Sequence, residues 1–569
     1  MKTVEIETAA EALLILLRER GIEYLFGNSG TDAAPLIEAY ARLKTIEGPA
    51  PKPVTVPHEI CAVSMAHGYA MVTGKPASVF VHVNVGTANA TTGIMNACRQ
   101  NTPILVMAGR NPIFEDEVLG SRDLRIHWAQ ESFDQGAMVR EYVKWDYELR
   151  DFQQLEVVVD RSLASAVSYP QGPVYLSLPR ERLASKQKKI SFHENNRLDS
   201  GAEAQADRKS VERAADLIAE ANFPLIIVND MGRETASVAE LVTLAETASI
   251  PVVEVSRQSM NFPANHPLHL GFSPAPIVQE ADLILAIEAD APWFPRRMAP
   301  NAETPVIQMG RDPLFSGYPI RGFPLDVALV GSPALSLASL CEALDSRLAG
   351  KEKSFLERKE KFRKRHEEFI NSRRKAAEEA SKLKPISMDW LSRCVGDAAD
   401  ENTILVNEYD LRADQLQLDR PGSYFGSPAV SGLGWGFGAA LGAKLGMPDS
   451  TVICTLGDGA YIFNNPIACH MTAAAQGLPI LLIIFNNQVW NAVRSSVADV
   501  APDGWAVSRE DYAFVHLTPS PEFEKIAEAC GGYGERIEEP SDIPAAIERG
   551  LREVRENKRH ALLNVICRI

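Results

Sequence analysis

Short apolar runs of strand length recur along the chain, and many of them begin with proline. Examples are residues 103–109, 173–179, 224–230, 251–255 and 479–485. The segments between these runs are rich in alanine, glutamate and leucine at helical spacing. Nearly continuous apolar strands that alternate with helices are typical of parallel sheets covered on both faces. The pattern therefore predicts an α/β fold.

Two polar segments divide the chain into three units. One covers residues 185–209, and the other covers residues 351–384, where 13 lysines and arginines accompany 7 glutamates. Phe355, Phe362 and Phe369 recur every seventh residue in the second segment, which keeps the rings near one helical face. We predict three doubly wound parallel-sheet domains at residues 1–185, 186–350 and 385–569. Residues 351–384 form a connecting helix that is docked by its phenylalanines.

Composition narrows the classes of partner. The 569 residues include 58 basic and 74 acidic side chains, a net charge of -16, so phosphate backbones and anionic lipid would repel the chain. Charged residues flank the apolar residues 12–17, as in an amphipathic helix rather than a signal peptide, and residues 478–485 are far too short to span a bilayer. The eight cysteines are scattered without a Cys-x-x-Cys pair, which is typical of neither a disulfide scaffold nor a thiolate zinc site. We expect a cytoplasmic protein that binds neither nucleic acid nor membrane.

The third unit contains the sharpest chemical signal. Gly457-Asp458-Gly459 ends one apolar run, Asn486-Asn487 ends the next, and a helical segment lies between them. Because parallel strands deliver their carboxyl ends to one edge of a sheet, Asp458 and Asn487 are predicted to lie close together. A carboxylate and an amide oxygen suit Mg²⁺, and the two glycines let the backbone approach a diphosphate. Two ordinary turns at strand ends are the competing interpretation.

This combination of Gly-Asp-Gly and an asparagine pair resembles the cofactor motif of the thiamine-diphosphate (ThDP) decarboxylase and acetolactate synthase family. The resemblance runs over nearly the whole chain, and the family's order of pyrimidine-binding, middle and diphosphate-binding domains matches the three predicted units. It implies that Asp458, Asn487 and the carbonyl of Val489 hold Mg²⁺. It also places Gly457 and Gly459 against the diphosphate of the cofactor.

A second landmark is Glu59, which follows an apolar run and opens a predicted helix with alanines 62, 66 and 70 on one face. By the resemblance, Glu59 is the catalytic acid that bonds to the pyrimidine ring and favours the cofactor form that takes a proton from thiazolium C2. The helix dipole favours a glutamate in the first turn of any helix, which is the competing explanation.

The third landmark is the glycine-rich stretch at residues 431–438. It resembles the family segment that holds ThDP in its V-shaped conformation, so Gly432 and Leu433 are expected to contact the cofactor, with Leu433 as the wedge between its rings. The glycines do not form a dinucleotide loop, because Gly-x-Gly-x-x-Gly fails at Leu441. Close packing of the following helix is the main competing explanation.

Two segments suggest residues of a substrate pocket. Residues 26–31 and 81–90 resemble the corresponding segments of the benzoylformate decarboxylase branch more closely than those of other branches. By position, Thr31 replaces a serine of that branch, His82 is the proton-relay histidine, and Asn28 contacts the cofactor. A buried histidine at a strand end is the competing interpretation of His82. The middle-domain histidine of that branch has no counterpart in residues 289–297, and the adjacent histidine pair of pyruvate decarboxylases is absent.

Further cofactor contacts are expected from the loop at residues 407–412, which stands where the family places small hydroxyl or amide residues. Leu411 is the residue of this loop that we assign to the cofactor. Trp490 and residues 130–135 are expected to line the pocket. Acetolactate synthases bind FAD in the middle domain, and the sequence neither indicates nor excludes FAD here.

The resemblance implies an enzyme that uses ThDP and Mg²⁺ to make or break a C–C bond next to a carbonyl. Decarboxylation of a small 2-oxo acid, with carboligation as a second outcome, is the favoured reaction. The alternatives are an acetolactate synthase-like carboligase, a 2-hydroxyacyl-CoA lyase, a non-catalytic ThDP-fold binding protein and an unrelated nucleotide-binding α/β enzyme. The family builds its active site between two chains, so a homodimer is the minimum assembly and a homotetramer is expected.

Overall fold

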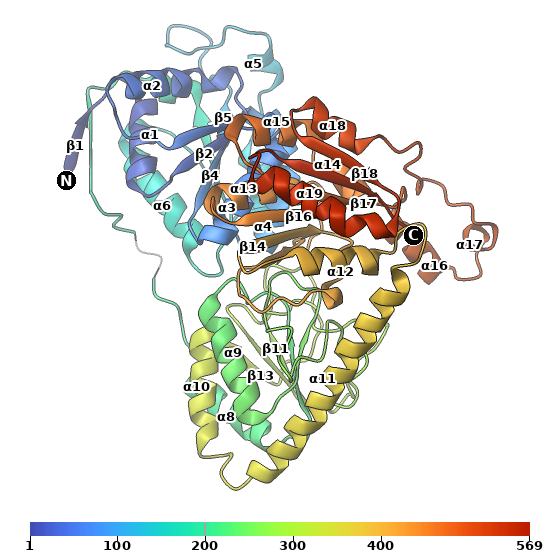
Figure 1. Cartoon of the computed structure of the whole chain (residues 1–569). Coiled ribbons are helices and arrows are strands. Elements are labelled where there is room, and N and C mark those ends of the chain that lie inside the picture. The colour runs from blue at the N-terminus through green and yellow to red at the C-terminus, as the bar shows by residue number, and fades with distance from the viewer. Residues whose placement is uncertain (199–200) are drawn as a thin grey trace. The chain divides into compact units, whose positions relative to one another are not determined.

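The computed structural model describes residues 1–198 and 201–569, which form two compact units. The first unit comprises Met1–Gly201, Ser427–Arg536 and Gly550–Asn564, and the second comprises Ala202–Gly426, Ile537–Arg549 and Val565–Ile569. Each unit therefore combines stretches that lie far apart in the sequence, as the colours of Figure 1 show.

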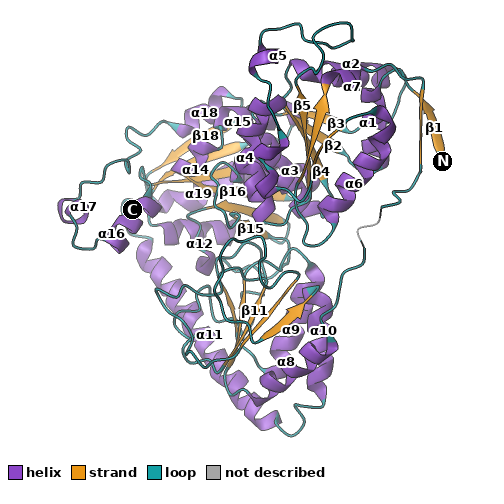
Figure 2. Cartoon of the chain, turned by 180° about the vertical axis from the view of Figure 1, so that it is seen from behind, coloured by secondary structure: helices purple, strands orange, loops and turns teal. Residues whose placement is uncertain are grey.

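The first unit is built on a six-stranded sheet with the order β3-β2-β4-β5-β7-β6. Every neighbouring pair in this sheet is parallel. Helices α1, α2 and α6 cover one face of the sheet, and α3 and α4 cover the other (Figures 1 and 2). The elements are β2 (Tyr24–Gly27), β3 (Lys52–Thr55), β4 (Ala77–Val81), β5 (Ile104–Arg110), β6 (Asp146–Glu148), β7 (Val174–Pro179), α1 (Ala9–Glu19), α2 (Ala34–Thr45), α3 (Glu59–Thr73), α4 (Val83–Arg99) and α6 (Leu155–Val167).

The second unit contains a five-stranded parallel sheet with the order β10-β9-β11-β12-β13. Helices α8, α9 and α10 lie on one side of it, and the long helix α11 runs along the other (Figures 1 and 2). The elements are β9 (Pro224–Val228), β10 (Val252–Glu254), β11 (Leu283–Ile287), β12 (Val306–Gly310), β13 (Val327–Val330), α8 (Arg208–Glu220), α9 (Thr235–Ala248), α10 (Pro333–Asp345) and α11 (Glu352–Ala380).

The last third of the chain contributes a third sheet. Within the first unit, β16 (Thr451–Gly457) and β17 (Leu481–Asn486) pair in parallel and are accompanied by α13 (Gly436–Gly446), α14 (Asp458–Phe463) and α15 (Pro466–Gln476). Within the second unit, β14 (Thr403–Glu408) and β15 (Tyr424–Gly426) pair in parallel. Helix α12 (Met388–Ala398) precedes β14 in the sequence. The remaining elements are β1 (Lys2–Glu5), β8 (Lys189–Phe192), β18 (Tyr533–Ile537), β19 (Ala561–Ile566), α5 (Ile126–Ala129), α7 (Arg180–Ala184), α16 (Asn491–Val500), α17 (Trp505–Arg509), α18 (Phe523–Ala529) and α19 (Ile543–Arg555).

The predicted fold class is confirmed, because the domains are parallel-sheet α/β structures with helices on both faces. The five apolar runs that predicted strands are β5, β7, β9, β10 and β17. The domain boundaries drawn from the sequence stay a prediction. Among the described residues, no helix is both long and apolar enough to cross a membrane.

The N-terminal helix differs from the amphipathic helix that the sequence predicts. All residues of α1 from Ala9 to Leu17 are buried, including Glu11 at 2% exposure. Helices α2, α6 and α7 pack around α1, so residues 9–17 leave no face to solvent, whereas Arg18 in the last turn is exposed. Glu11 is tolerated in this position because its carboxylate pairs with Arg42 at 2.6 Å and accepts a hydrogen bond from the Glu7 backbone N–H.

Helix α11 is docked by its phenylalanines. Phe362 is 1% exposed, and its ring centroid lies 5.1 Å from that of Phe223 in the second unit. About two helical turns further along α11, Phe369 packs against the backbone at Gly271. Charged side chains near these rings form ion pairs, for example Arg363 with Glu360 at 2.6 Å on the helix surface and Arg365 with Glu280 at 2.8 Å.

Candidate functional site

Glu59 is a buried carboxylate held by two amide groups. It is the first residue of α3, and the side chain of His58 caps the helix by accepting from the Ile60 backbone N–H. Asn28, just after β2, donates from Nδ2 to Glu59 Oε1 at 3.1 Å, and Asn89 on α4 donates to Oε2 at the same distance. Each carboxylate oxygen thus has one fixed donor, which sets the orientation of the group. Only 5% of the residue is exposed, so these two amides take the place of water as hydrogen-bond donors.

Sequence reasoning missed Asn89. The residue lies inside the segment 81–90 that drew attention to His82, but its role depends on how α4 crosses α3. Gly86, one turn earlier on α4, helps this approach, since a Cβ there would lie 3.2 Å from Glu59 Oε1. The sequence signal that could have indicated this contact is a glycine, Gly86, three positions before Asn89. Such a pair lies on one face of a helix, and here that face is turned toward Glu59.

His82 lies where β4 ends and α4 begins, and its ring is paired with an acid. Nδ1 makes a short hydrogen bond with Asp32 Oδ1, and Nε2 lies 3.5 Å from the side-chain nitrogen of Gln130. The hydrogen bond to Asp32 raises the pKa of His82 against the opposing effect of burial. His82 thus lies at a strand end with its ring paired to a buried acid, and its role as a proton relay stays a prediction.

Thr31 and Asp32 stand side by side but differ in environment. Thr31 begins a short 3₁₀ turn (Thr31–Ala33) and is exposed, whereas Asp32 is 3% exposed. The predicted role of Thr31 stays a prediction. Asp32 was not predicted from the sequence, because no local pattern distinguishes it from an acid that starts a helix.

Asp458 and Asn487 meet at the carboxyl edge of β16 and β17, as the sequence predicts. The strands pair in register up to Gly457 and Phe485. Asp458 Oδ2 accepts from the backbone N–H of Gln488 at 2.7 Å, and Oδ1 accepts from that of Gly459 at 2.9 Å. Both Asp458 (3% exposed) and Asn487 (7% exposed) are buried.

The donor set at this edge fits a hard cation. Asp458 offers a carboxylate, Asn487 a side-chain amide oxygen and Val489 a backbone carbonyl, and all three are oxygen ligands of the kind that Mg²⁺ prefers. Among the described residues, no group of three His, Cys, Asp or Glu side chains is placed to hold a metal. A cation at this edge would therefore complete its shell with oxygens of a bound ligand, such as a diphosphate.

Gly459 is required by its neighbour Trp490. A Cβ at residue 459 would overlap the indole ring of Trp490, which also packs edge-on against Phe463 with centroids 5.8 Å apart. The indole thus lies directly beside the Gly-Asp-Gly turn, where the sequence expects it to narrow a pocket. Gly457 is the last residue of β16 and is buried.

The segment around Leu433 is fixed to the first sheet's helices within the same unit. The Asn96 side chain on α4 accepts from the Gly432 N–H at 3.1 Å and donates to the Gly432 carbonyl at 2.8 Å. Ser64 on α3 donates to the Gly434 carbonyl at 3.2 Å. These bonds hold the backbone on both sides of the half-buried Leu433, as a rigid support for a wedge requires.

Leu411, the predicted cofactor residue from the loop after β14, belongs to the second unit. It is buried and follows Tyr409 and Asp410, which both have left-handed backbones with φ of 70° and 74°. Burial raises the pKa of Asp410 to about 6. The cofactor contact of Leu411 stays a prediction.

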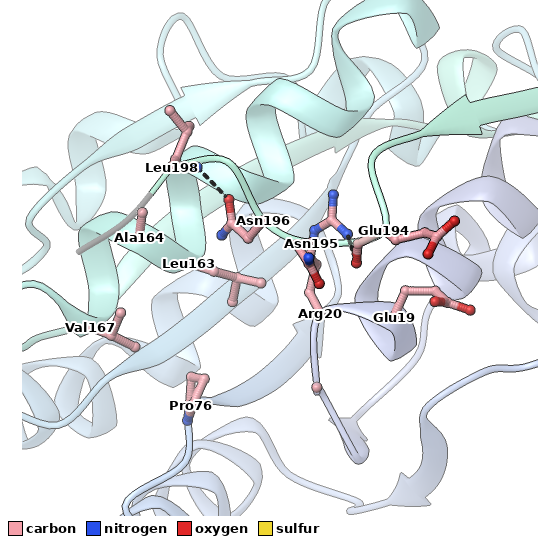
Figure 3. Close-up of a pocket in the computed structure, with 11 residues that line it drawn as sticks. Glu19, Arg20, Pro76, Leu163, Ala164, Val167, Glu194, Asn195, Asn196 and Leu198 are labelled. Carbon is pink, nitrogen blue, oxygen red and sulfur yellow. Dashed lines mark hydrogen bonds between the residues drawn. The ribbon is translucent and has the colours of Figure 1, made fainter. Parts of the chain in front are cut away.

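A separate cavity of about 640 Å³ contains none of the predicted site residues (Figure 3). Its apolar side comes from α6, with Leu163, Ala164 and Val167. The Arg20 guanidinium at its rim is already occupied, since it bonds Asp160, Glu156 and the carbonyls of His193 and Glu194. Among the lining residues that the structure describes, no cationic group is therefore free to meet an anionic substrate.

A parallel-sheet α/β fold with a buried acid at the start of α3 and an oxygen-rich turn after β16 defines the class of protein. Family models identify that class. The thiamine pyrophosphate enzyme N-terminal TPP binding domain matches residues 7–138, the central domain matches residues 211–340, and the C-terminal TPP binding domain matches residues 409–565. The chain belongs to the thiamine pyrophosphate enzyme family.

Known proteins of this family are similar over most of the chain. Benzoylformate decarboxylase of Pseudomonas aeruginosa is 28% identical over 507 residues, which cover 86% of this chain and 87% of the relative. The acetolactate synthase isozyme 3 large subunit of Escherichia coli is 25% identical over 578 residues, covering 98% and 94%. The solved ThDP-dependent 4-hydroxybenzoylformate decarboxylase of Rhodococcus jostii RHA1 shares the fold, with a TM-score of 0.78, 23% identity and 99% coverage of both chains.

Proposed function

We propose that this chain is a ThDP- and Mg²⁺-dependent enzyme that decarboxylates a 2-oxo acid, as a benzoylformate decarboxylase does, and that can also join the remaining acyl fragment to a second carbonyl. The observation that supports this most directly is Glu59, a buried carboxylate held by two amide donors at the start of α3 in the N-terminal TPP binding domain. A protein that had kept only the fold would have no need of an acid buried in this way.

Bound ThDP supplies a carbon nucleophile and accepts the electrons that are released when CO₂ leaves. The residues of this chain hold and orient it. Asp458, Asn487 and the Val489 carbonyl would ligate Mg²⁺, the backbone at Gly457 and Gly459 would lie against the diphosphate, and the fixed segment at Gly432 would support Leu433 between the cofactor rings. Leu411 is proposed as a further cofactor contact.

The acid and base groups of the first domain would act on the cofactor and the substrate. Glu59 would accept a hydrogen bond from the pyrimidine ring, with Asn28 keeping Oε1 in place. His82 would carry a proton at Nε2, and the exposed hydroxyl of Thr31 would bond to the substrate carboxylate or carbonyl. Trp490 would limit the size of the pocket.

A second candidate function is an acetolactate synthase-like carboligase. The observation in its favour is the similarity to acetolactate synthase large subunits over nearly the full length of both chains. The absence of a middle-domain histidine from residues 289–297, where the decarboxylase branch has one, points the same way. Product analysis separates the two, because a decarboxylase releases an aldehyde and a carboligase makes a 2-hydroxy ketone or acid.

The assembly we propose is a homodimer at minimum and a homotetramer in the full enzyme. Its support is the resemblance, by which Glu59 of one subunit serves the cofactor held by Asp458 of another. We also propose a cytoplasmic location, which the eight free cysteines support.

Two measurements test the function. Titration of the apo-protein with ThDP in the presence and absence of Mg²⁺ should show metal-dependent binding, whereas ATP and NAD should show none. Binding of either nucleotide but not of ThDP would overturn the proposal.

Release of CO₂ from benzoylformate, pyruvate, phenylpyruvate and branched 2-oxo acids, with and without an acceptor aldehyde, then identifies the reaction. Binding of ThDP without turnover of any of these substrates would leave the 2-hydroxyacyl-CoA lyase and the non-catalytic protein as the alternatives.

A further inference from the structure

We propose that Asp32 is a positioning residue for His82, which fixes the proton on Nδ1 of the imidazole and leaves Nε2 as the atom that exchanges a proton with the substrate. The proton exchange between Nε2 and a substrate rests on the proposed function, whereas the pairing of Asp32 with His82 does not. The state of the imidazole itself can be measured in the protein without cofactor.

The backbone is shaped to accommodate this pair. A Cβ at Gly30 would overlap the His82 ring, and a Cβ at Gly109 would overlap the Asp32 carboxylate. Gly30 directly precedes the 3₁₀ turn that carries Asp32, and Gly109 lies on β5. Glycines on two separate elements thus make room for the pair. The contact between Asp32 and His82 therefore belongs to the fold and is not a chance approach of surface groups.

The turn that presents His82 is also held by Asp32. Val83 has a φ of 30°, a conformation that β-branched residues seldom adopt and that surrounding contacts must stabilise. The second carboxylate oxygen of Asp32 lies 3.5 Å from the Val83 N–H. One buried carboxylate therefore faces both the imidazole and the backbone of the next residue.

The chemistry follows from what each group can donate. A carboxylate only accepts hydrogen bonds, so the proton of the short Asp32–His82 bond belongs to Nδ1, and Nε2 is left to gain or lose a proton. In the proton step, Nε2–H gives its proton to the substrate, the N–H bond breaks, and a neutral imidazole remains with Nδ1–H on Asp32. Solvent protonates Nε2 again. Of the His82 side chain, 18% is exposed, which allows this exchange.

The charges around His82 favour its protonated form. Asp32 on the 3₁₀ turn and Glu59 on α3 both raise its pKa, while burial lowers it. Gln130, which follows α5, contributes a neutral amide at 3.5 Å from Nε2, and Gly109 on β5 contributes no charge. His127 on α5 interacts electrostatically with Asp32, and its own pKa is lowered mainly by burial, so it adds no cation beside the pair near neutral pH. Asp32 is therefore the group whose removal should change the titration most.

The test compares wild type, Asp32→Asn and Asp123→Asn. Asparagine keeps an acceptor oxygen at residue 32 but removes the charge. Asp123 forms the matched control, because it pairs with His127 Nδ1 at 3.2 Å in the same unit, is 60% exposed at its side chain and lies outside the proposed machinery. The apo-proteins carry isotope-labelled histidine, His82→Gln assigns the His82 signal, and thermal unfolding checks that each variant is folded.

In wild type we expect the Nδ1–H tautomer of His82 and a pKa above the ordinary histidine value. In Asp32→Asn the pKa of His82 should fall by about one unit or more, whereas Asp123→Asn should leave it unchanged. An unaltered titration of His82 in folded Asp32→Asn, or an Nε2–H tautomer in wild type, would overturn the proposal. These readouts do not depend on whether any 2-oxo acid is a substrate.

The pH dependence of kcat tests the link to catalysis. His82 is active as an acid, so activity falls as pH rises through its pKa, and a lower pKa in Asp32→Asn moves that fall to lower pH by the same amount. A profile that does not move although the titration of His82 does would refute the catalytic part. Failure of the proposed function would appear differently, as absent turnover in wild type with the histidine titration intact.

Discussion

At the scale of single residues, the site depends on polar groups whose hydrogen bonds are supplied by other elements. Glu59 is set by amides from the end of β2 and from α4, and Asp458 by the backbone of the turn after β17. Burial makes each of these bonds more influential, because a buried carboxylate without donors costs a few kcal/mol. The orientation of both acids is thus fixed before any ligand binds.

Replacing Glu59 by glutamine should separate binding from catalysis. Glu59→Gln keeps the shape of the side chain, so ThDP should bind with an affinity within about tenfold of wild type. Turnover should fall by at least about 100-fold, because the carboxylate that favours the proton-accepting form of the cofactor is lost. Calorimetric titration and CO₂ release measure the two effects. Glu181→Gln is the matched control, since Glu181 is also buried in the first unit but accepts from the backbone N–H of Phe114, which is not a predicted site residue. Near-normal turnover in Glu59→Gln would contradict the role assigned to this acid.

The residue scale is also where prediction from sequence stops. Glu59, Asp458 and Asn487 could be predicted because each lies at the end of a strand or the start of a helix with a recognisable neighbourhood. Asn89 and Asp32 could not, because their partners lie 30 and 50 positions away and only the crossing of α3, α4 and the 3₁₀ turn brings them together. The family resemblance supplied roles for residues in its motifs and none for these two.

At the scale of elements, helices and strands follow closely from the pattern of apolar residues. The five predicted strands appear because parallel strands covered on both faces must be apolar throughout, which leaves a clear signal. The burial of α1 was not predictable from its own sequence, because it results from three other helices that pack around it. Helix α11 illustrates the opposite case, since its few apolar residues already indicate which face docks.

Truncation of Phe362 should destabilise the second unit. Phe362→Ala removes a fully buried ring that packs on Phe223, and such changes cost about 3–5 kcal/mol. Denaturant unfolding followed by the fluorescence of Trp293, which is buried in the same apolar cluster, reports the shift. Leu356→Ala on the same helix is the control and should change stability by less than about 0.5 kcal/mol, because Leu356 is 68% exposed. Equal effects of the two substitutions would show that α11 is not anchored by its buried ring.

At the scale of the whole molecule, the proposed site requires two copies of the chain. This requirement can be tested with dimers that combine two different inactive variants. Glu59→Gln and Asp458→Asn are co-expressed with different tags, and the mixed dimers are purified through both tags. If Glu59 of one subunit serves the cofactor held by Asp458 of the other, one of the two sites in a mixed dimer contains both native residues, and about half of the wild-type activity should return.

The control for this experiment is Glu59→Gln carrying both tags, which should stay inactive. If all catalytic residues came from one chain, every site in the mixed dimer would contain one defect, and activity would remain at the level of the single variants. That result would disprove the shared site without affecting the assignment of the cofactor.

The composition of the two compact units from distant stretches affects how the protein is made. The first unit needs residues 550–564 and the second needs residues 565–569, so each stays incomplete until these late stretches have been synthesised. At about 5–20 residues per second, a ribosome takes about half a minute to two minutes to produce this polypeptide. Throughout that time the nascent chain exposes apolar sheet surfaces whose covering segments do not yet exist, which makes it a natural client for chaperones that shield such surfaces during translation.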